Sequence, residues 1–186
     1  MTRKKLTRAQ LECLSSLVRV DLYEAIQRHD GASIGELANE LKKSPHTLYY
    51  HVRQLSDVQL IRVREYRRVG KRDEAIYEVV SKRLFIDQQN SSPEYSEALA
   101  KTVGSALRKA EREHRAARLK LTQPSKFAVA RAQVKLTSKD ADKLRQRISD
   151  LTQWVRERNI MNDDVEGEEV SYTCVVAPIE RSKNVD

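Results

Sequence analysis

The fold of this chain is decided by residues 44–55, which read SPHTLYYHVRQL. Serine is a preferred helix N-cap and proline is preferred at the first helical position, so Ser44 and Pro45 mark a helix start. Apolar residues then recur at a spacing of three to four, which places them on one helical face: Leu48, Val52 and Leu55. The stretch therefore predicts a helix over residues 45–55 with one side in a core.

The residues before this stretch predict further helices and a tight turn. Ser33 with Glu36 three residues later is a capping box, and it starts a helix that reaches about Leu41. Only Lys42, Lys43 and the N-cap Ser44 separate that helix from the next, which is the spacing of a helix-turn-helix. Upstream, apolar residues predict a short helix, a break at two serines and a second helix: Leu11, Leu14, Leu17, Val18, Leu22 and Ile26.

Two strand-like stretches follow and predict a hairpin. Residues 60–66 alternate between apolar and polar, a turn around Gly70 comes next, and residues 75–80 form the second strand. A hairpin directly after the third helix is a wing, so residues 61–80 complete a winged helix-turn-helix. Regular alternation would put three side chains on the face opposite the apolar positions: Arg62, Arg64 and Tyr66.

The composition favours a polyanionic partner. The 186 residues carry a formal net charge of +8, and the sequence pI is about 9.5. The start of the sequence lacks the apolar segment of a secretory signal, and the longest apolar run near the end is too short to span a bilayer. Cys13 and Cys174 lie far apart and are expected to be free thiols in a reducing compartment. We therefore expect a cytoplasmic protein that does not enter a membrane.

The outward face of the helix at 45–55 carries side chains suited to DNA. Once the apolar positions face a core, the following side chains face solvent: His46, Thr47, Tyr49, Tyr50 and Arg53. Arginine bonds guanine edges in the major groove, whereas tyrosine and lysine more often reach phosphates. The turn and the wing add further candidates: Lys42, Lys43, Ser44, Arg62, Arg64, Arg67, Arg68, Lys71 and Arg72. A charged hairpin can also be a solvated edge that prevents strand pairing, but its place directly after a recognition-type helix favours DNA.

Together these motifs resemble the ArsR-like winged helix-turn-helix regulators of bacteria. The resemblance covers roughly the first half of the chain and rests on residues 17–19, 34–38 and 44–55 and on the arginine-rich wing. It implies a homodimer on a palindromic operator, with the outward residues of the third helix in the major groove. Metal sensors of that family carry paired cysteines before the recognition helix, or His and acidic ligands on a later helix. Residues 34–41 contain neither Cys nor His, so we expect no metal and no other cofactor.

We expect an α+β, mostly helical fold in three parts. Residues 1–86 form the winged helix-turn-helix and bind DNA. Residues 87–124 form a linker and a long helix that contributes to dimerisation. Residues 125–186 form a small β-α-β region for dimerisation or effector binding.

The β-α-β expectation rests on patterning in the last third of the chain. Residues 127–136 and 170–178 alternate weakly like strands, and residues 137–158 between them carry an apolar helical seam. That seam favours burial against a second copy of the chain: Ala141, Leu144, Ile148, Leu151 and Val155. The alternative is a pocket for an unknown small-molecule effector, lined by Trp154 or Phe127. A lone tryptophan beside an apolar stripe is more often core, so we favour dimerisation.

The sequence thus predicts a sequence-specific double-stranded DNA-binding transcriptional regulator, expected to be a homodimeric repressor. It has no Gly-rich phosphate loop, nucleophile elbow or paired Cys–His motif, so we expect neither an enzyme nor catalytic residues. The alternatives are an RNA-binding or protein-interaction winged helix, or a ligand-responsive regulator. Basic residues on both the third helix and the wing favour DNA over RNA or protein as the partner.

Overall fold

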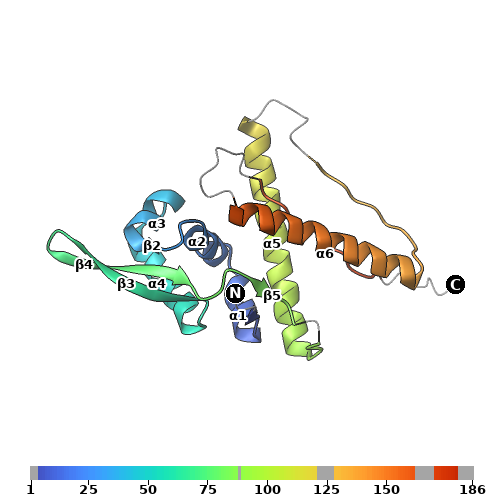
Figure 1. The fold of residues 1–186 in the computed structure, drawn as a ribbon, viewed down its shortest axis with the longest axis horizontal. Helices are drawn as coiled ribbons and strands as arrows, with labels where there is room; N and C mark the ends of the chain where they lie inside the picture. The colour runs from blue at the N-terminus through green and yellow to red at the C-terminus, as the bar shows by residue number, and fades with distance from the viewer. Residues whose placement is uncertain (1–3, 88, 121–127, 162–169, 180–186) are drawn as a thin grey trace. The chain divides into compact units, whose positions relative to one another are not determined.

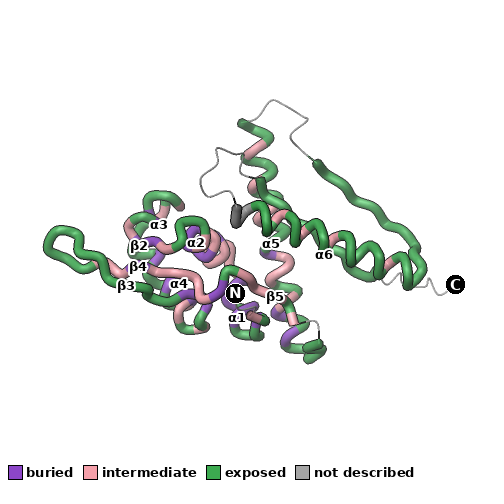
Figure 2. Tube along the Cα trace, viewed as in Figure 1, coloured by how far each residue is buried: buried purple, intermediate pink, exposed green. Residues whose placement is uncertain are grey.

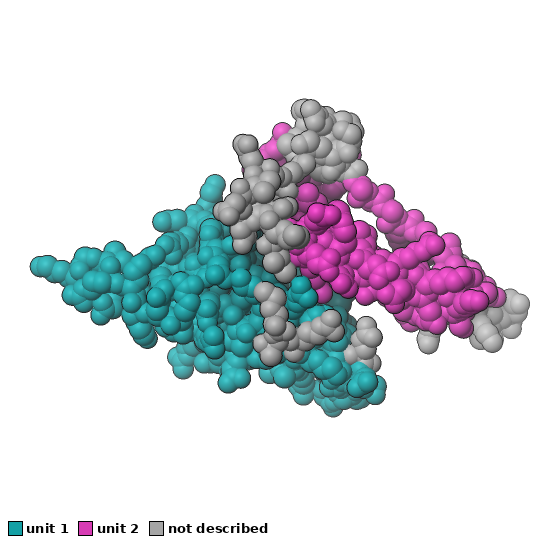
Figure 3. Space-filling view, viewed as in Figure 1, with its two compact units in different colours: residues 1–111 teal, residues 112–186 magenta. Residues whose placement is uncertain are grey.

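The computed structural model describes residues 4–87, 89–120, 128–161 and 170–179. The chain divides into two compact units, Met1–Glu111 and Arg112–Asp186 (Figure 3). The first unit contains all the strands of the described residues and most of the helices.

Four helices of the first unit follow the predicted order (Figure 1): α1 (Arg8–Leu14), α2 (Leu17–Arg28), α3 (Ile34–Leu41) and α4 (Pro45–Asp57). Ser33 and Glu36 form the expected capping box at the start of α3, and the Ser44 hydroxyl caps α4. Helix α3 ends at Lys42, whose left-handed φ of 51° turns the chain towards α4. The helix-turn-helix is therefore set by local cap chemistry as well as by packing.

A three-stranded antiparallel sheet completes the fold, in the order β2-β4-β3. Its strands are β2 (Ala32–Ser33), β3 (Ile61–Val69) and β4 (Arg72–Val79). The β3–β4 hairpin extends from the helices as the wing (Figure 1). A separate parallel pair joins β1 (Lys4–Lys5) to β5 (Leu84–Phe85). The predicted α+β, mostly helical fold with an N-terminal winged helix-turn-helix is confirmed.

The wing departs from regular alternation at Arg64. Val63 lies opposite Tyr77, but Tyr66 lies opposite Ala75, because a bulge between Val63 and Glu65 adds one residue to β3. Residues 75 and 77 share one face of β4, so Tyr66 lies on the same face as Val63. The prediction that Tyr66 lies on the opposite face is wrong, because the sequence pattern does not mark the inserted residue.

One hydrophobic core holds the first unit together (Figure 2). It contains fully buried side chains from α1 to α4 and from the start of β3: Leu11, Leu22, Ile26, Leu37, Leu48, Leu55, Leu60 and Ile61. Helix α5 (Pro93–Lys120) adds Tyr95 and Ala98 to this core. The Tyr95 hydroxyl donates to the carbonyl of Leu6 at 3.2 Å. The compact unit therefore runs to Glu111, beyond the boundary expected at residue 86.

A partly buried ion pair also ties α5 to α2. The Lys109 ammonium lies 2.8 Å from the carboxylate of Asp21 and 3.0 Å from that of Glu24. The side chains of Lys109 and Asp21 are only 15% and 9% exposed. Taking charges out of water is unfavourable unless they are paired, so the Lys109 ammonium and these two carboxylates stabilise one another.

The second unit contains the expected helix but not the expected strands. Helix α6 (Ser138–Met161) matches the prediction for residues 137–158. Residues 128–137 and 170–179 form no strand, so the β-α-β prediction is wrong for the described residues, and Phe127 lies outside them. Apolar alternation favours extended backbone, but a strand also needs a hydrogen-bonded neighbour, which neither segment has within the described chain.

None of the predicted seam residues of α6 is fully buried: Leu144 and Leu151 are exposed, and Ala141, Ile148 and Val155 are half-buried. Leu151 is 45% exposed, and Trp154 is 55% exposed with the Arg158 guanidinium 5.8 Å from its ring centre.

Within the described ranges, no helix is both long enough and apolar enough to cross a bilayer.

The ion pair between α5 and α2 gives a stability prediction. Lys109→Met keeps the aliphatic stem but removes the ammonium from Asp21 and Glu24, so the free energy of unfolding should fall by about 1–3 kcal/mol. Urea unfolding with linear extrapolation measures the change. The control is Lys101→Met, which removes an exposed pair with Glu97 on the same helix and should change stability by less than about 0.5 kcal/mol. Equal losses in the two variants would show that the Lys109 pair is not structural.

Candidate nucleic-acid interface

Helix α4 has one buried and one exposed face. Leu48, Val52 and Leu55 are at most 2% exposed and hold the helix in the core. All five predicted recognition residues lie on the exposed side: His46, Thr47, Tyr49, Tyr50 and Arg53. Tyr49 and Tyr50 are 60% and 61% exposed, and the Arg53 side chain is 83% exposed with only a loose 3.9 Å pair to Asp57. These groups are therefore available to a ligand that lies along α4.

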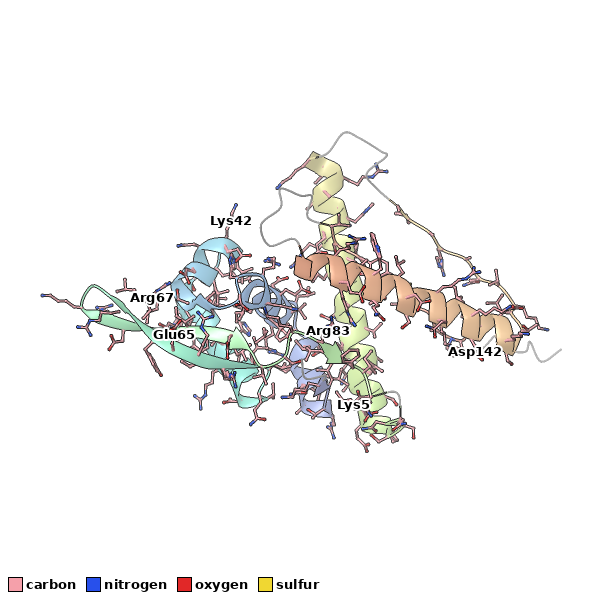
Figure 4. The ribbon with its side chains drawn as sticks, viewed as in Figure 1. Lys5, Lys42, Glu65, Arg67, Arg83 and Asp142 are labelled. Atoms are coloured by element: carbon pink, nitrogen blue, oxygen red, sulfur yellow. The ribbon has the colours of Figure 1, made fainter. Side chains whose placement is uncertain are left out.

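The turn before α4 adds cations and a cap. The Ser44 hydroxyl accepts from the backbone N–H of Thr47 at 3.3 Å and lies 2.8 Å from the Thr47 hydroxyl. The main role of Ser44 is therefore to cap the N-terminus of α4. Lys42 extends away from the helices (Figure 4), and neither Lys42 nor Lys43 forms an ion pair with any described residue. The positive charge of both lysines remains open to a phosphate.

A polar chain that sequence reasoning missed holds the Tyr50 phenol. Arg19 of α2 donates to the Gln54 side-chain oxygen at 2.6 Å, and the Gln54 amide donates to the Tyr50 hydroxyl oxygen at 2.9 Å. Arg19 is itself fixed by a bond to the carbonyl of Cys13. Because the Tyr50 oxygen already accepts a bond, its hydrogen is free to donate outward. The spacing of four between Tyr50 and Gln54 is a sequence signal for this contact, but the role of Arg19 needs the tertiary structure.

His51 is half-buried, between the exposed Tyr50 and the buried Val52. Its Nδ1 atom is buried and has no hydrogen-bond partner in the described structure. Burial lowers the pKa of His51, and the positive charges of Arg19 and Lys43 lower it further. His51 is therefore neutral at physiological pH and adds no charge to the exposed face of α4.

Four of the six predicted wing cations are paired with acidic side chains. Arg62 lies 2.7 Å from Glu78, Arg64 lies 2.9 Å from Glu65, and Arg68 lies 3.1 Å from Asp73. Arg67 lies 2.8 Å from Glu36 and 3.3 Å from Glu74. By contrast, the two cations at the hairpin tip, Lys71 and Arg72, have no acidic partner among the described residues. The wing thus carries two classes of cation that the sequence alone does not separate.

Arg64 and Arg67 attach the wing to the helices. Arg64 donates to the carbonyl of Asp30 at 2.6 Å. A Cβ added to Gly31 would lie 2.8 Å from the same guanidinium, so Gly31 allows this close approach. Arg67 reaches across to Glu36 of α3 and is labelled in Figure 4. These two arginines add side-chain contacts to the β2–β4 pairing that joins the wing to the helices.

Glu36 joins helix capping to wing attachment. One of its carboxylate oxygens accepts from the backbone N–H of Ser33, and the other accepts from Arg67. The bond from Ser33 lowers the pKa of Glu36, and the bond from Arg67 lowers it further. The negative charge that holds Arg67 is therefore present throughout the neutral pH range.

A groove of about 510 Å³ runs between α4 and the inner face of the wing. It is lined by residues of α4 and of both wing strands: Tyr49, Tyr50, Val52, Arg53, Ser56, Val63 and Tyr77. The exposed face of α4, this groove and the hairpin tip form a continuous part of the first unit. None of the described residues gather into a cluster of three or more potential metal ligands.

Comparison with known proteins agrees with this geometry. The model of a helix-turn-helix domain family matches residues 14–64, from the end of α1 to the middle of β3. The matched residues include the two helices, α3 and α4, that form the helix-turn-helix in the structure. No curated protein matches the chain. Among solved structures, the chain is similar to a double mutant of ZitR from Lactococcus lactis, with 15% identity and a TM-score of 0.27. That match covers 82% of this chain and 77% of the other, and at this TM-score the two chains do not superpose as a whole.

Proposed function

We propose that this protein is a sequence-specific double-stranded DNA-binding transcriptional regulator and not an enzyme. The observation that carries the proposal is the exposed face of α4. On this face two phenols, an imidazole, a hydroxyl and a guanidinium project from a rigidly anchored helix. A helix of this kind fits the major groove, where such groups meet base edges and phosphates.

The free cations are placed where a duplex would need them. Lys42 and Lys43 precede α4 and would face the phosphates at one edge of the major groove. Lys71 and Arg72 at the wing tip would reach phosphates or the adjacent minor groove. Paired Arg62, Arg64, Arg67 and Arg68 would shape the wing and add less to DNA attraction, because each already has an acidic neighbour.

Double-stranded RNA is a poorer partner for the same surface. The major groove of A-form RNA is deep and narrow and does not admit a helix. The base-reading groups of this domain lie on α4 itself, so they need a groove wide enough for that helix. A protein partner is also disfavoured, because the exposed cations at the turn and the wing tip match a polyanion.

We further propose that the functional unit is a homodimer that pairs through α5. The outward face of α5 contains Ala100, Gly104 and the 48% exposed Leu107, beside a hollow of about 410 Å³ that also includes Ser15. Glycine inside a helix costs about 1 kcal/mol relative to alanine. Among the described residues, a Cβ on Gly104 would meet only the end of Arg108, at 3.4 Å, so packing within the chain does not require glycine there. Close approach of a second helix would explain it.

Repression is the regulatory outcome that the ArsR-like resemblance suggests. A dimer would place two α4 helices in successive major grooves of a palindromic site, about 34 Å apart. A dimer bound in this way across a promoter blocks the polymerase without any further contact. The genes beside the DNA sites that such a regulator occupies would indicate where it acts and whether it responds to an effector.

The deciding experiment is capture of sheared genomic DNA on the purified full-length protein over a salt series, followed by sequencing of the retained fragments. The proposal expects a recurring palindrome that stays bound as salt rises, since specific contacts outlast electrostatic ones. Retention that declines uniformly with salt, with no enriched sequence, would contradict sequence-specific binding.

The two classes of wing cation give a quantitative prediction. The double change of Lys71→Gln and Arg72→Gln should reduce the slope of log K against log salt by roughly 0.9 for each cation removed, because each releases counterions from a phosphate. Arg67→Gln should leave that slope unchanged, since Arg67 is held by Glu36 and Glu74. Fluorescence anisotropy on a captured duplex from about 50 to 200 mM salt measures both slopes. Equal slope changes would show that pairing within the wing does not separate the two classes.

The α5 interface gives a prediction on assembly. Gly104→Leu should convert the dimer to a monomer, because the new side chain keeps two α5 helices apart. Its melting temperature as a monomer should not fall, since leucine favours a helix by about 0.8 kcal/mol over glycine and meets only the flexible end of Arg108. Light scattering gives the mass and circular dichroism gives the melting curve. A Gly104→Leu protein that stays dimeric would place the dimer interface elsewhere.

A further inference from the structure

Three tyrosines line the groove between α4 and the wing, and a fourth lies on the same face of the wing. Tyr49 and Tyr50 come from α4, Tyr77 comes from β4, and the bulge at Arg64 brings Tyr66 of β3 to the same side. Tyr49 and Tyr77 line the same groove, and the register of the hairpin puts Tyr66 on the same face as Tyr77. Burial raises the pKa of Tyr77, and the neighbouring Tyr49 and Tyr66 raise it further. Sequence patterning put Tyr66 on the other face, so this cluster exists only because of the bulge.

The cluster leaves much aromatic surface in water. Tyr66 is 70% exposed, and Tyr49 and Tyr50 are each about 60% exposed. Val63 at the floor of the groove is 39% exposed. Large rings with a polar tip are frequent where one side of a contact is apolar and the other is polar. The occupant of the groove therefore needs both an apolar and a hydrogen-bonding part.

The geometry of a duplex supplies such an occupant. If α4 lies in the major groove and the wing tip reaches the adjacent minor groove, one sugar-phosphate strand separates the two grooves. That strand has to cross the space between α4 and the wing. Its deoxyribose is apolar and its phosphate oxygens accept hydrogen bonds. Arg53 beside the groove and Lys71 and Arg72 at the wing tip add the positive charge that a phosphate strand requires.

We propose that the tyrosine groove holds this backbone strand, with deoxyribose packed on the rings of Tyr66 and Tyr49 and a phosphate accepting from the Tyr50 hydroxyl. The Arg19–Gln54 chain fixes the Tyr50 oxygen as an acceptor inside the protein and so directs its hydrogen into the groove. The inference rests on the proposed DNA-binding function and adds Tyr66 and Tyr77 to its contact surface. The role of the tyrosine groove is to set the register of α4 on the duplex.

Contacts of this kind differ from those of the free cations in their response to salt. A neutral phenol releases no counterion when it meets a phosphate, so it contributes equally at low and high salt. Loss of a tyrosine contact should therefore shift the whole binding curve and leave its slope unchanged. Loss of Lys71 and Arg72 should change the slope.

The test compares Tyr66→Ala and Tyr66→Phe with the wild type on a duplex of about 30 base pairs, roughly three helical turns, taken from the captured genomic fragments. Tyr66→Ala should weaken binding by about tenfold at every salt concentration, the scale of one neutral contact, and Tyr66→Phe should weaken it less. The control is Val69→Ala, which removes an exposed apolar side chain from the other face of the same strand and should bind like the wild type. Tyr66 is mostly exposed, so melting curves should show that all variants fold.

Hydroxyl-radical footprinting on the same duplex gives a direct readout. The wild type should protect deoxyribose on the one strand between the α4 and wing contacts, and Tyr66→Ala should lose protection there while keeping it elsewhere. Unchanged affinity and protection in Tyr66→Ala, while the wild type binds the duplex, would overturn the inference and leave the proposed function intact. A failure of the wild type to bind any duplex would instead overturn the proposed function. If Tyr66→Ala weakened binding only to the matching single strand, the groove would be a stacking site for unpaired bases and the inference would be wrong.

Discussion

Leu48, Val52 and Leu55 bury one face of α4, and the rest of the interface depends on that burial. Each buried aliphatic side chain contributes about 1.5–3 kcal/mol, so the three together prevent α4 from rotating about its axis. The helix is therefore a fixed support, and its outward residues are placed before any ligand arrives. Preorganisation of this kind reduces the entropy lost on binding. The Arg19–Gln54–Tyr50 chain extends the same rigidity to one of the phenols.

The second constraint is electrostatic. A formal net charge of +8 suggests a broad positive surface, but the wing shows that counting cations overstates the field. An arginine beside a carboxylate has little net charge at a distance, and exposed pairs such as these are each worth about 0–1 kcal/mol. Several weak pairs together with the close fit of Arg64 against Gly31 hold the wing in place. The same acidic residues leave Lys71 and Arg72 at the hairpin tip as the wing cations without an acidic partner among the described residues.

Local signals made the first half of the fold predictable. The Ser33–Glu36 capping box, the Ser44-Pro45 helix start and the hairpin turn at Gly70 all depend on residues within four positions of one another. The exposed face of α4 followed from helical periodicity in the same way. The bulge at Arg64 and the partners of the wing arginines depend on register and on contacts distant in sequence, so no local pattern indicates them. The strand predictions for residues 128–136 and 170–178 failed for a related reason. Alternation of apolar residues is a property of one segment, whereas a sheet requires hydrogen bonds between two strands.

The composition of α4 also bears on why a single copy of the domain would be insufficient. Arg53 is the only arginine between Pro45 and Asp57, and one bidentate contact to a base discriminates by about 1–3 kcal/mol. Specific regulators bind their sites about 4–10 kcal/mol more tightly than other DNA. One recognition helix of this composition falls short of that range, because backbone contacts from lysines and tyrosines position the helix without reading sequence. Two helices on a two-fold site double the base-reading contribution while the backbone contacts keep each in register. In the proposed dimer, the sparse base-reading face of α4 and the Gly104 face of α5 would serve one purpose, because specificity would come from pairing two weakly discriminating halves.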